Sequence, residues 1–290
     1  MKTKLMIGVV LTWVIAGMGG CTKPSPMTDA TIQLNWLHDP TFTGEYLLTK
    51  RNDVHVAIRE GGPNISPLSE LGSRRATAAI VGADIFLQAV EKDLKDGKKS
   101  QLMCIFVDFQ RNPIGWVLHP KAAEKAGMPK GIVNDPKKLN EWLFEKFKDG
   151  TIQVGDKRGT ETTSIWIQWK KAHGLPDTVN VLPVGFDTSI VLGAPMLAYP
   201  VYLNEEPFKL TEKIGHPVLV FDPAVDGIEL YGNVVVTTQS FIQANPQQVR
   251  ALQTALRASW ERAKIDHAFA LAEVGAFYKG VSEAVLKQQI

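Results

Sequence analysis

The chain has 290 residues, of which 44% are hydrophobic and 21% are charged. These proportions are typical of a folded globular protein, and the length allows one or two domains, each with its own core. Because 32 basic and 30 acidic residues are interspersed and the formal net charge is only +2, the sequence lacks the basic stripe that neutralises a row of phosphates. We therefore do not expect nucleic acid as a partner.

The amino terminus has the layout of a secretory signal. Lys2 and Lys4 precede an apolar run, and small residues then lead into Cys21. The apolar run is shorter than the roughly 20 residues that a helix needs to cross a bilayer. We therefore expect residues 1–20 to be a cleaved signal peptide, and residues 21–29, which hold prolines and small polar residues, to be a tether.

The site at Cys21 resembles the bacterial lipobox, in which the thiol is diacylglycerol-modified, although Met18 stands where the box usually has leucine. Acylation would anchor the protein to a cell membrane, facing the periplasm or the exterior. The alternative is a soluble exported protein in which Cys21 is incidental. The other cysteine, Cys104, lies in an apolar run and is expected to be a small buried hydrophobe.

After the tether, short β-rich segments alternate with helical ones, a pattern that predicts α/β lobes with mostly parallel sheets. The predicted strands are residues 32–36, 54–59, 78–81, 102–109, 114–118, 151–154, 179–184, 198–203, 218–221 and 234–238. The predicted helices are residues 41–49, 67–73, 85–94, 136–147, 164–173, 246–265 and 268–278. We assign 30–112 to the first part of lobe 1, 113–225 to lobe 2, and 226–290 to a return strand and C-terminal helices of lobe 1.

Ligands of open α/β sheets bind at the carboxyl ends of strands, where loops present backbone N–H groups. The loops at such positions are residues 35–39, 61–64, 82–84, 155–161, 185–187 and 200–207. Trp36 and Tyr202 end predicted strands and could stack a planar heterocycle while Asn35 bonds its edge, although Trp36 could equally cap the core. Glu205 and Glu206 are suited to amino groups, or are simply surface residues.

Catalytic and metal-binding patterns are poor. Neither G-x-S-x-G nor H-E-x-x-H occurs, and the six histidines lack metal-ligand spacing; among them, only His38 lies in a candidate ligand loop. The stretch from Gly155 to Thr160 lacks the spacing of a nucleotide-binding P-loop but could bind a small anion as a turn before a helix. We therefore expect no enzyme, no cofactor and no metal site.

Several stretches in chain order resemble the periplasmic-binding-type proteins of the thiamine-pyrimidine group. They read IQLNWLHDPTFTGEYL from Ile32, GGP from Gly61, IVGADIFL from Ile80, LPVGFD from Leu182, YPVYLNEEP from Tyr199 and DGIELYGNVVVTTQSFIQANPQQVR from Asp226. This group includes importer components for pyrimidine precursors and relatives that bind flavins or other solutes. The resemblance implies an α/β, two-lobed periplasmic-binding-protein-like (type II) fold with a ligand cleft between the lobes.

The resemblance also implies docking to the permease subunits of an ABC importer, and we expect a monomer. By motif and loop position, the residues expected to bind the ligand are Asn35, Trp36, His38, Gly82, Ala83, Asp84, Asp187, Tyr202 and Glu206. Two positions depart from the family pattern: Thr43 stands where relatives often have alanine, and Glu205 where they often have asparagine.

The leading hypothesis is a lipid-anchored solute-binding protein that closes around a small planar nitrogen heterocycle, such as a thiamine-precursor pyrimidine. A flavin or another small solute is the alternative within the same family. A pyrimidine-synthase-type enzyme is a further alternative, but the sequence lacks the cysteine-rich motif of that branch. A third is a sensor lipoprotein that docks to a membrane receptor instead of a permease.

Overall fold

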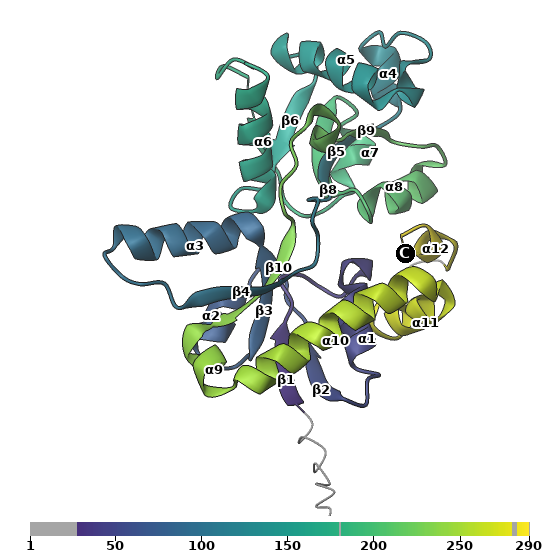
Figure 1. Cartoon of the computed structure of the whole chain (residues 1–290). Coiled ribbons are helices and arrows are strands. Elements are labelled where there is room, and N and C mark those ends of the chain that lie inside the picture. Colours follow the sequence, from purple (N-terminus) through teal and green to yellow (C-terminus); the bar gives the residue numbers. More distant parts are fainter. Residues whose placement is uncertain (1–27, 180, 280–282, 290) are drawn as a thin grey trace, which may run out of the picture.

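A computed structural model describes residues 28–179, 181–279 and 283–289. The expected signal peptide and Cys21 lie outside the described residues. The chain forms two lobes, each built on a five-stranded sheet, and two crossover segments connect them (Figure 1). The predicted α/β, two-lobed class is confirmed.

The described residues of lobe 1 form five strands and seven α-helices. Its strands, in the spatial order β2-β1-β3-β10-β4, are β2 (Val54–Arg59), β1 (Thr28–Gln33), β3 (Ala78–Gly82), β10 (Asn233–Thr238) and β4 (Leu102–Val107). Its helices are α1 (Thr43–Leu48), α2 (Pro67–Gly72), α3 (Ala83–Lys95), α9 (Gln239–Ala244), α10 (Pro246–Ile265), α11 (His267–Phe277) and α12 (Glu283–Gln289).

Lobe 2 is a continuous stretch of chain between the two crossovers. Its strands, in the order β7-β6-β8-β5-β9, are β7 (Val181–Pro183), β6 (Gln153–Asp156), β8 (Leu197–Tyr202), β5 (Ile114–Leu118) and β9 (Leu219–Phe221). Its helices are α4 (Lys121–Lys125), α5 (Pro136–Lys148), α6 (Glu161–Ala172), α7 (Ile190–Gly193) and α8 (Glu206–Ile214).

The sheets are mixed, whereas the sequence predicted mostly parallel ones. Strand β1 is parallel to β2 and β3, with Ile32 opposite Ile58, but β10 runs antiparallel to both β3 and β4. In lobe 2, β6 is parallel to β7 and β8, and β5 is antiparallel to β8 and β9. The reason is that β5 and β10 each enter their sheet from the other lobe and therefore run against the βαβ strands.

The helices form where the sequence offers an apolar stripe and a cap. Helix α10 buries Leu252 and Leu256 against the lobe 1 sheet, and Figure 1 shows it lying diagonally across that lobe. Helix α6 begins at Glu161 rather than at the predicted Ser164. The earlier start is set by the Thr160 side chain, which caps the helix by accepting a hydrogen bond from the Thr162 amide.

Two predictions on lobe 1 differ from the structure. The first strand begins at Thr28, inside the expected tether, and ends at Gln33, before the chain turns toward the space between the lobes. Cys104 is exposed rather than buried, because β4 is an edge strand whose outward face is only partly covered. Apolar neighbours in sequence do not reveal that a strand lies at an edge.

The two crossovers pair with each other to form the hinge. The Gly232 amide donates to the Phe109 carbonyl at 2.9 Å, and the Asn112 amide donates to the Leu230 carbonyl at 2.7 Å. A Cβ on Gly232 would lie 3.0 Å from the Phe109 Cβ, so the close approach favours glycine at this position. A hydrogen-bonded ribbon therefore connects the lobes.

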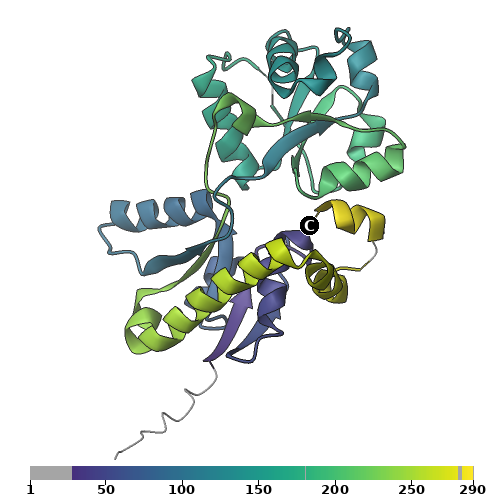
Figure 2. The same ribbon diagram turned by 45° about the vertical axis from the view of Figure 1, so that its right-hand side comes forward.

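The C-terminal segment makes a second link between the lobes. Helix α12 follows the lobe 1 helices but packs against α8 of lobe 2, and both ribbon views place it beside that helix (Figures 1 and 2). Its Val285 and Leu286 side chains are buried. Helix α12 thus adds a contact between the lobes to those made at the crossovers.

Candidate functional site

A cavity of about 560 Å³ lies between the two lobes. Its walls come from the ends of strands and the loops after them, as expected for open α/β sheets. Each of the six loops singled out from the sequence contributes at least one lining residue. Lobe 1 contributes Asn35, Trp36, Leu37, Asp39, Thr41, Phe42, Gly62, Pro63, Ile65, Pro67, Val81, Gly82, Ile85 and Asn233; lobe 2 contributes Ile114, Lys157, Gly159, Thr160, Glu161, Thr162, Phe186, Thr188, Val201, Tyr202, Glu205, Glu206 and Lys209.

Five of the nine predicted ligand residues line this cavity, and four lie outside its wall. The five are Asn35, Trp36, Gly82, Tyr202 and Glu206; the four are His38, Ala83, Asp84 and Asp187. The His38 ring instead contacts the Tyr46 hydroxyl at 3.1 Å through Nδ1 and packs on Phe277.

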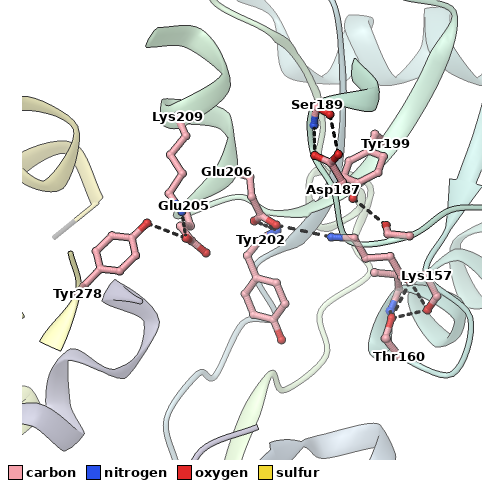
Figure 3. Close-up of polar contacts among 12 residues, drawn as sticks. Lys157, Thr160, Asp187, Ser189, Tyr199, Tyr202, Glu205, Glu206, Lys209 and Tyr278 are labelled. Carbon is pink, nitrogen blue, oxygen red and sulfur yellow. Dashed lines mark hydrogen bonds and ion pairs between the residues drawn. The ribbon is translucent and has the colours of Figure 1, made fainter. Parts of the chain in front are cut away.

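The two carboxylates outside the wall hold local structure. Asp187 is exposed, and it accepts hydrogen bonds from the Ser189 amide and hydroxyl at 2.9 and 2.7 Å (Figure 3). Asp84 accepts a 2.5 Å hydrogen bond from the Ser164 hydroxyl, which connects α3 of lobe 1 to α6 of lobe 2. Asp84 therefore contributes to contact between the lobes.

One wall is aromatic. Trp36 of lobe 1 and Phe186 of lobe 2 face each other with ring centroids 4.7 Å apart and planes inclined by 45°. Beside them, Asn35 donates to the Asn233 side chain at 3.0 Å, and its own Oδ1 is buried without a partner among the described residues. A flat ring bound against this wall would find both an apolar surface and a free hydrogen-bond acceptor.

Glu206 and Lys157 form a buried ion pair in the wall. Their Oε1 and Nζ atoms are 3.6 Å apart, and the Tyr202 amide donates to Glu206 Oε2 at 2.7 Å (Figure 3). The Lys157 ammonium also lies 4.9 and 5.7 Å from the ring centroids of Tyr199 and Phe186. Burial raises the pKa of Glu206 and lowers that of Lys157, and the attraction within the pair opposes both shifts.

A second acidic group, Glu205, is held from both lobes. Lys209 of α8 forms an ion pair with it, and the Tyr278 hydroxyl of lobe 1 donates to Glu205 Oε1 at 3.1 Å (Figure 3). The Lys209 ammonium lies 4.9 Å from the Tyr278 ring centroid. Burial opposes the charge of Lys209, but the Glu205 carboxylate outweighs that effect and raises the Lys209 pKa.

Glu161 lies where the lobes meet near the hinge. Its carboxyl oxygens accept from the side-chain Nδ2 of Asn112 at 2.8 Å and from the Tyr202 hydroxyl at 2.9 Å. A Cβ on Gly82 would come within 2.4 Å of the Glu161 Cδ, so glycine lets the two lobes approach here. Burial, with a smaller contribution from Asp84, raises the pKa of Glu161 to about 7.

Asp39 is the acidic group that lobe 1 contributes to the cavity. Its Oδ1 accepts from the Thr41 amide at 2.7 Å and so caps the short 3₁₀ turn Pro40–Phe42. The side chain is buried, and burial followed by the charges of Glu205 and Glu206 raises its pKa well above the usual range. These acids of opposite lobes line the same cavity.

The sequence indicated the loops better than the side chains that act in them. Lys157 lies in the predicted ligand loop 155–161 and Glu161 ends it, but neither side chain was singled out, and Asp39 ends the loop 35–39 without being named among the ligand residues. Lys209 and Tyr278 gave no signal, because their proximity to Glu205 depends on how α8 and the C-terminal segment pack.

Metal binding and membrane spanning find no support in the described part of the chain. No three or more His, Cys, Asp or Glu residues described there form a group that could hold a metal ion. Within residues 28–179, 181–279 and 283–289, no helix is both long and apolar enough to cross a membrane.

Comparisons with known proteins agree with this architecture. Residues 153–267 match the model of the family described as "NMT1/THI5 like". No curated protein sequence matches the chain. The periplasmic-binding-type resemblance drawn from the sequence is thus confirmed by a family model over residues 153–267, and the thiamine-pyrimidine subtype stays a prediction.

Solved structures confirm the fold. A ligand-binding component of an ABC-type import system from Staphylococcus aureus, with zinc bound, is 16% identical, with a TM-score of 0.57 over 91% of this chain and 83% of that one. The periplasmic aliphatic sulphonate-binding protein of Escherichia coli is 13% identical, with a TM-score of 0.59 over 91% and 83%. The periplasmic nitrate-binding protein of Synechocystis PCC 6803 is 14% identical, with a TM-score of 0.59 over 90% and 69%. The chain has the periplasmic-binding-protein fold.

Proposed function

We propose that the protein is the extracytoplasmic solute-binding component of an ABC importer. The observation that carries this proposal is the cavity of about 560 Å³ enclosed between two lobes that a hydrogen-bonded hinge connects. Hinge closure around a ligand is the way two-lobed proteins bind and release small molecules. The three similar solved proteins, which are an import-system component and two periplasmic binding proteins, support the same class.

The proposed ligand is a small planar nitrogen heterocycle such as a thiamine-precursor pyrimidine. The wall formed by Trp36 and Phe186 offers aromatic surface, the free Asn35 Oδ1 accepts an N–H, and the carboxyl groups accept others. A simple oxyanion such as the sulphonate or nitrate of the similar proteins would instead face four carboxyl groups. A flavin or another solute of this size is the alternative within the class.

We further propose that Cys21 carries the lipid anchor and that a membrane permease receives the solute. Metabolic labelling with a fatty acid tests the anchor: the full chain should incorporate label and Cys21→Ser should not. Label retained by Cys21→Ser would contradict the anchor at this residue.

The binding function is tested by native mass spectrometry of protein purified without refolding. A bound solute should appear as added mass, and the identified compound, supplied at a hundred times its dissociation constant, should stabilise the protein by about 2.7 kcal/mol. Protein that carries no solute, and that no fraction of a metabolite extract stabilises, would contradict the proposal. Turnover of the bound compound would instead favour the enzyme alternative.

A further inference from the structure

Carboxyl groups outnumber cationic groups in the cavity wall. Four carboxyl side chains line it, those of Asp39, Glu161, Glu205 and Glu206, whereas the lining residues include two lysines and no arginine. Each lysine is paired with one glutamate of lobe 2. Asp39 and Glu161 are therefore left without a basic partner in the wall.

Asp39 brings to the cavity wall a carboxyl group that no basic side chain of the wall neutralises. Its residue is 5% exposed, its Oδ1 accepts from the Thr41 amide, and the two lysines of the wall form their ion pairs with Glu206 and Glu205 instead of with Asp39. A carboxylate oxygen in a site that excludes water is costly unless a donor or a cation reaches it. A cationic group of a ligand would thus supply Asp39 with the positive partner that the wall does not provide.

Closing the lobes brings like charges together. Asp39 belongs to lobe 1, whereas Glu205 and Glu206 belong to lobe 2. The negative charge of each glutamate raises the pKa of Asp39. Two negative charges that approach at reduced dielectric repel each other, so the closed arrangement is unfavourable unless positive charge lies between them. A proton can supply that charge, and so can a ligand.

The wall already accommodates one cation. The Lys157 ammonium is held by the Glu206 carboxylate and the rings of Tyr199 and Phe186, and the lysine is only 8% exposed. A carboxylate beside aromatic faces is a suitable setting for an organic cation. Because the described residues hold no group suited to a metal ion, an organic cation fits the wall better than a bare metal.

We propose that the solute carries a positive charge and binds between Asp39 of lobe 1 and the Glu205–Glu206 pair of lobe 2, with its flat part against Trp36 and Phe186. This inference rests on the proposed function and names the charge class of the solute. The solute is an organic cation, and its charge offsets the repulsion that otherwise opposes closure.

The test uses a metabolite extract separated by ion exchange into cationic, neutral and anionic fractions, each added to the protein in a thermal-shift assay. The cationic fraction should raise the melting temperature, and the other two should not. A shift produced by the neutral or anionic fraction alone would overturn the charge class while leaving solute binding intact. If no fraction shifts the melting temperature, the proposed function fails, and the charge inference fails with it.

Matched variants locate the cation. Asp39→Asn should require at least ten times more of the cationic fraction for a half-maximal shift, and Glu206→Gln provides a second variant if the first does not fold. Glu91→Gln is the control, because Glu91 lies exposed on α3 and only pairs with Lys95. Unchanged titrations in folded Asp39→Asn and Glu206→Gln would overturn the proposed position of the charge.

Discussion

Two sets of buried carboxyl groups lie in this molecule, and they differ in access. One set lines the cavity between the lobes. The other is a pair inside lobe 1, formed by Glu45 of α1 and Asp108 just after β4. The Glu45 side chain is fully buried, and neither residue lines the cavity.

The pair in lobe 1 is closed off. Glu45, Asp108 and the Trp260 indole N–H are mutually within reach, and their polar side-chain atoms have no other partner among the described side chains. Burial raises the pKa of Glu45 to about 7; burial and the neighbouring Glu45 raise that of Asp108 well above its usual range. A proton shared between the Glu45 and Asp108 carboxyl groups would stabilise this buried pair.

The comparison shows that a raised pKa does not by itself mark a ligand site. Glu45 in the sealed pair and Glu161 in the cavity wall both have a pKa raised to about 7, and burial is the main cause for each. What differs is that the wall opens on a space large enough for a solute. The sealed pair should therefore affect stability, and the cavity set should affect binding.

The largest expected effect concerns the pH dependence of stability. Because the folded state raises the pKa of Glu45 from 4.5 to about 7, it binds this proton more tightly than the unfolded chain. The stabilisation that this Glu45 proton gives the folded state is fully present below pH 4.5 and is lost as the pH rises through 7. The free energy of unfolding changes by about 3 kcal/mol over this range. Glu45→Gln should flatten that decline, as denaturant unfolding at pH 5 and 8 would show. Asp39, Asp108 and Glu161, whose pKa values are also raised, supply a residual pH dependence in both proteins. If the stability of Glu45→Gln falls as steeply between pH 5 and pH 8 as that of the parent, Glu45 is not the group responsible.

The next effect concerns the packing that seals this pair. A Cβ on Gly44 would lie 2.3 Å from ring atoms of Trp260, so Gly44→Ala should overpack the interior of lobe 1 and cost about 1 to 3 kcal/mol of unfolding free energy. Gly275→Ala on α11 is the matched control, because a Cβ there meets no atom within 4 Å. Affinity should stay unchanged in both. A Gly44→Ala protein as stable as the control would show that Trp260 moves freely.

Gly82→Ala should weaken solute binding and leave the stability of the folded protein nearly unchanged. Its Cβ would meet the Glu161 carboxyl carbon at 2.4 Å, which holds the lobes apart beside the hinge. We expect about a tenfold loss of affinity for the co-purified solute, or about 1.4 kcal/mol, measured by titration calorimetry. Gly193→Ala, at a position with open space, is the control. Equal affinity in both variants would mean that the contact is not needed for closure.

The smallest expected effect is at Tyr278. Tyr278→Phe removes the hydroxyl that donates to Glu205 but keeps the ring that the Lys209 ammonium contacts. The loss should be about 0.5 to 1.5 kcal/mol of binding free energy, seen as faster solute release in stopped-flow measurements. Tyr231→Phe removes an exposed hydroxyl and should release solute at the parental rate. Identical rates in the two variants would show that this link between the lobes does not act in closure.

The sequence predicts individual elements where a residue pattern is local. Val54–Arg59, Ile114–Leu118 and Pro246–Ile265 have the bounds that were predicted, because each is a continuous β-rich run or an amphipathic stripe between turn residues. Helix α8 was missed, since residues 200–207 were interpreted as a loop after a strand. Strand direction was also missed, because it depends on which lobe a strand comes from.

The candidate site was predictable only as a set of loops. Strand ends face the cleft in any open α/β sheet, which indicated the positions of Asn35, Trp36 and Tyr202. The role of side chains across the cleft depends on residues far apart in the chain: the Tyr278 hydroxyl meets a glutamate 73 positions earlier. No local pattern encodes such a distance.

The position of β10 bears on the order in which the molecule can be completed during synthesis. It lies between β3 and β4, so the lobe 1 sheet lacks an inner strand until the chain has passed through all of lobe 2. Lobe 2, in contrast, draws its sheet from one uninterrupted segment. A chain that stops before residue 233 would leave β3 and β4 with unpaired edges, the kind of exposed backbone that recruits other chains. Truncations at the C-terminal end should therefore aggregate through lobe 1, while residues 113–225 are the part best placed to fold by themselves.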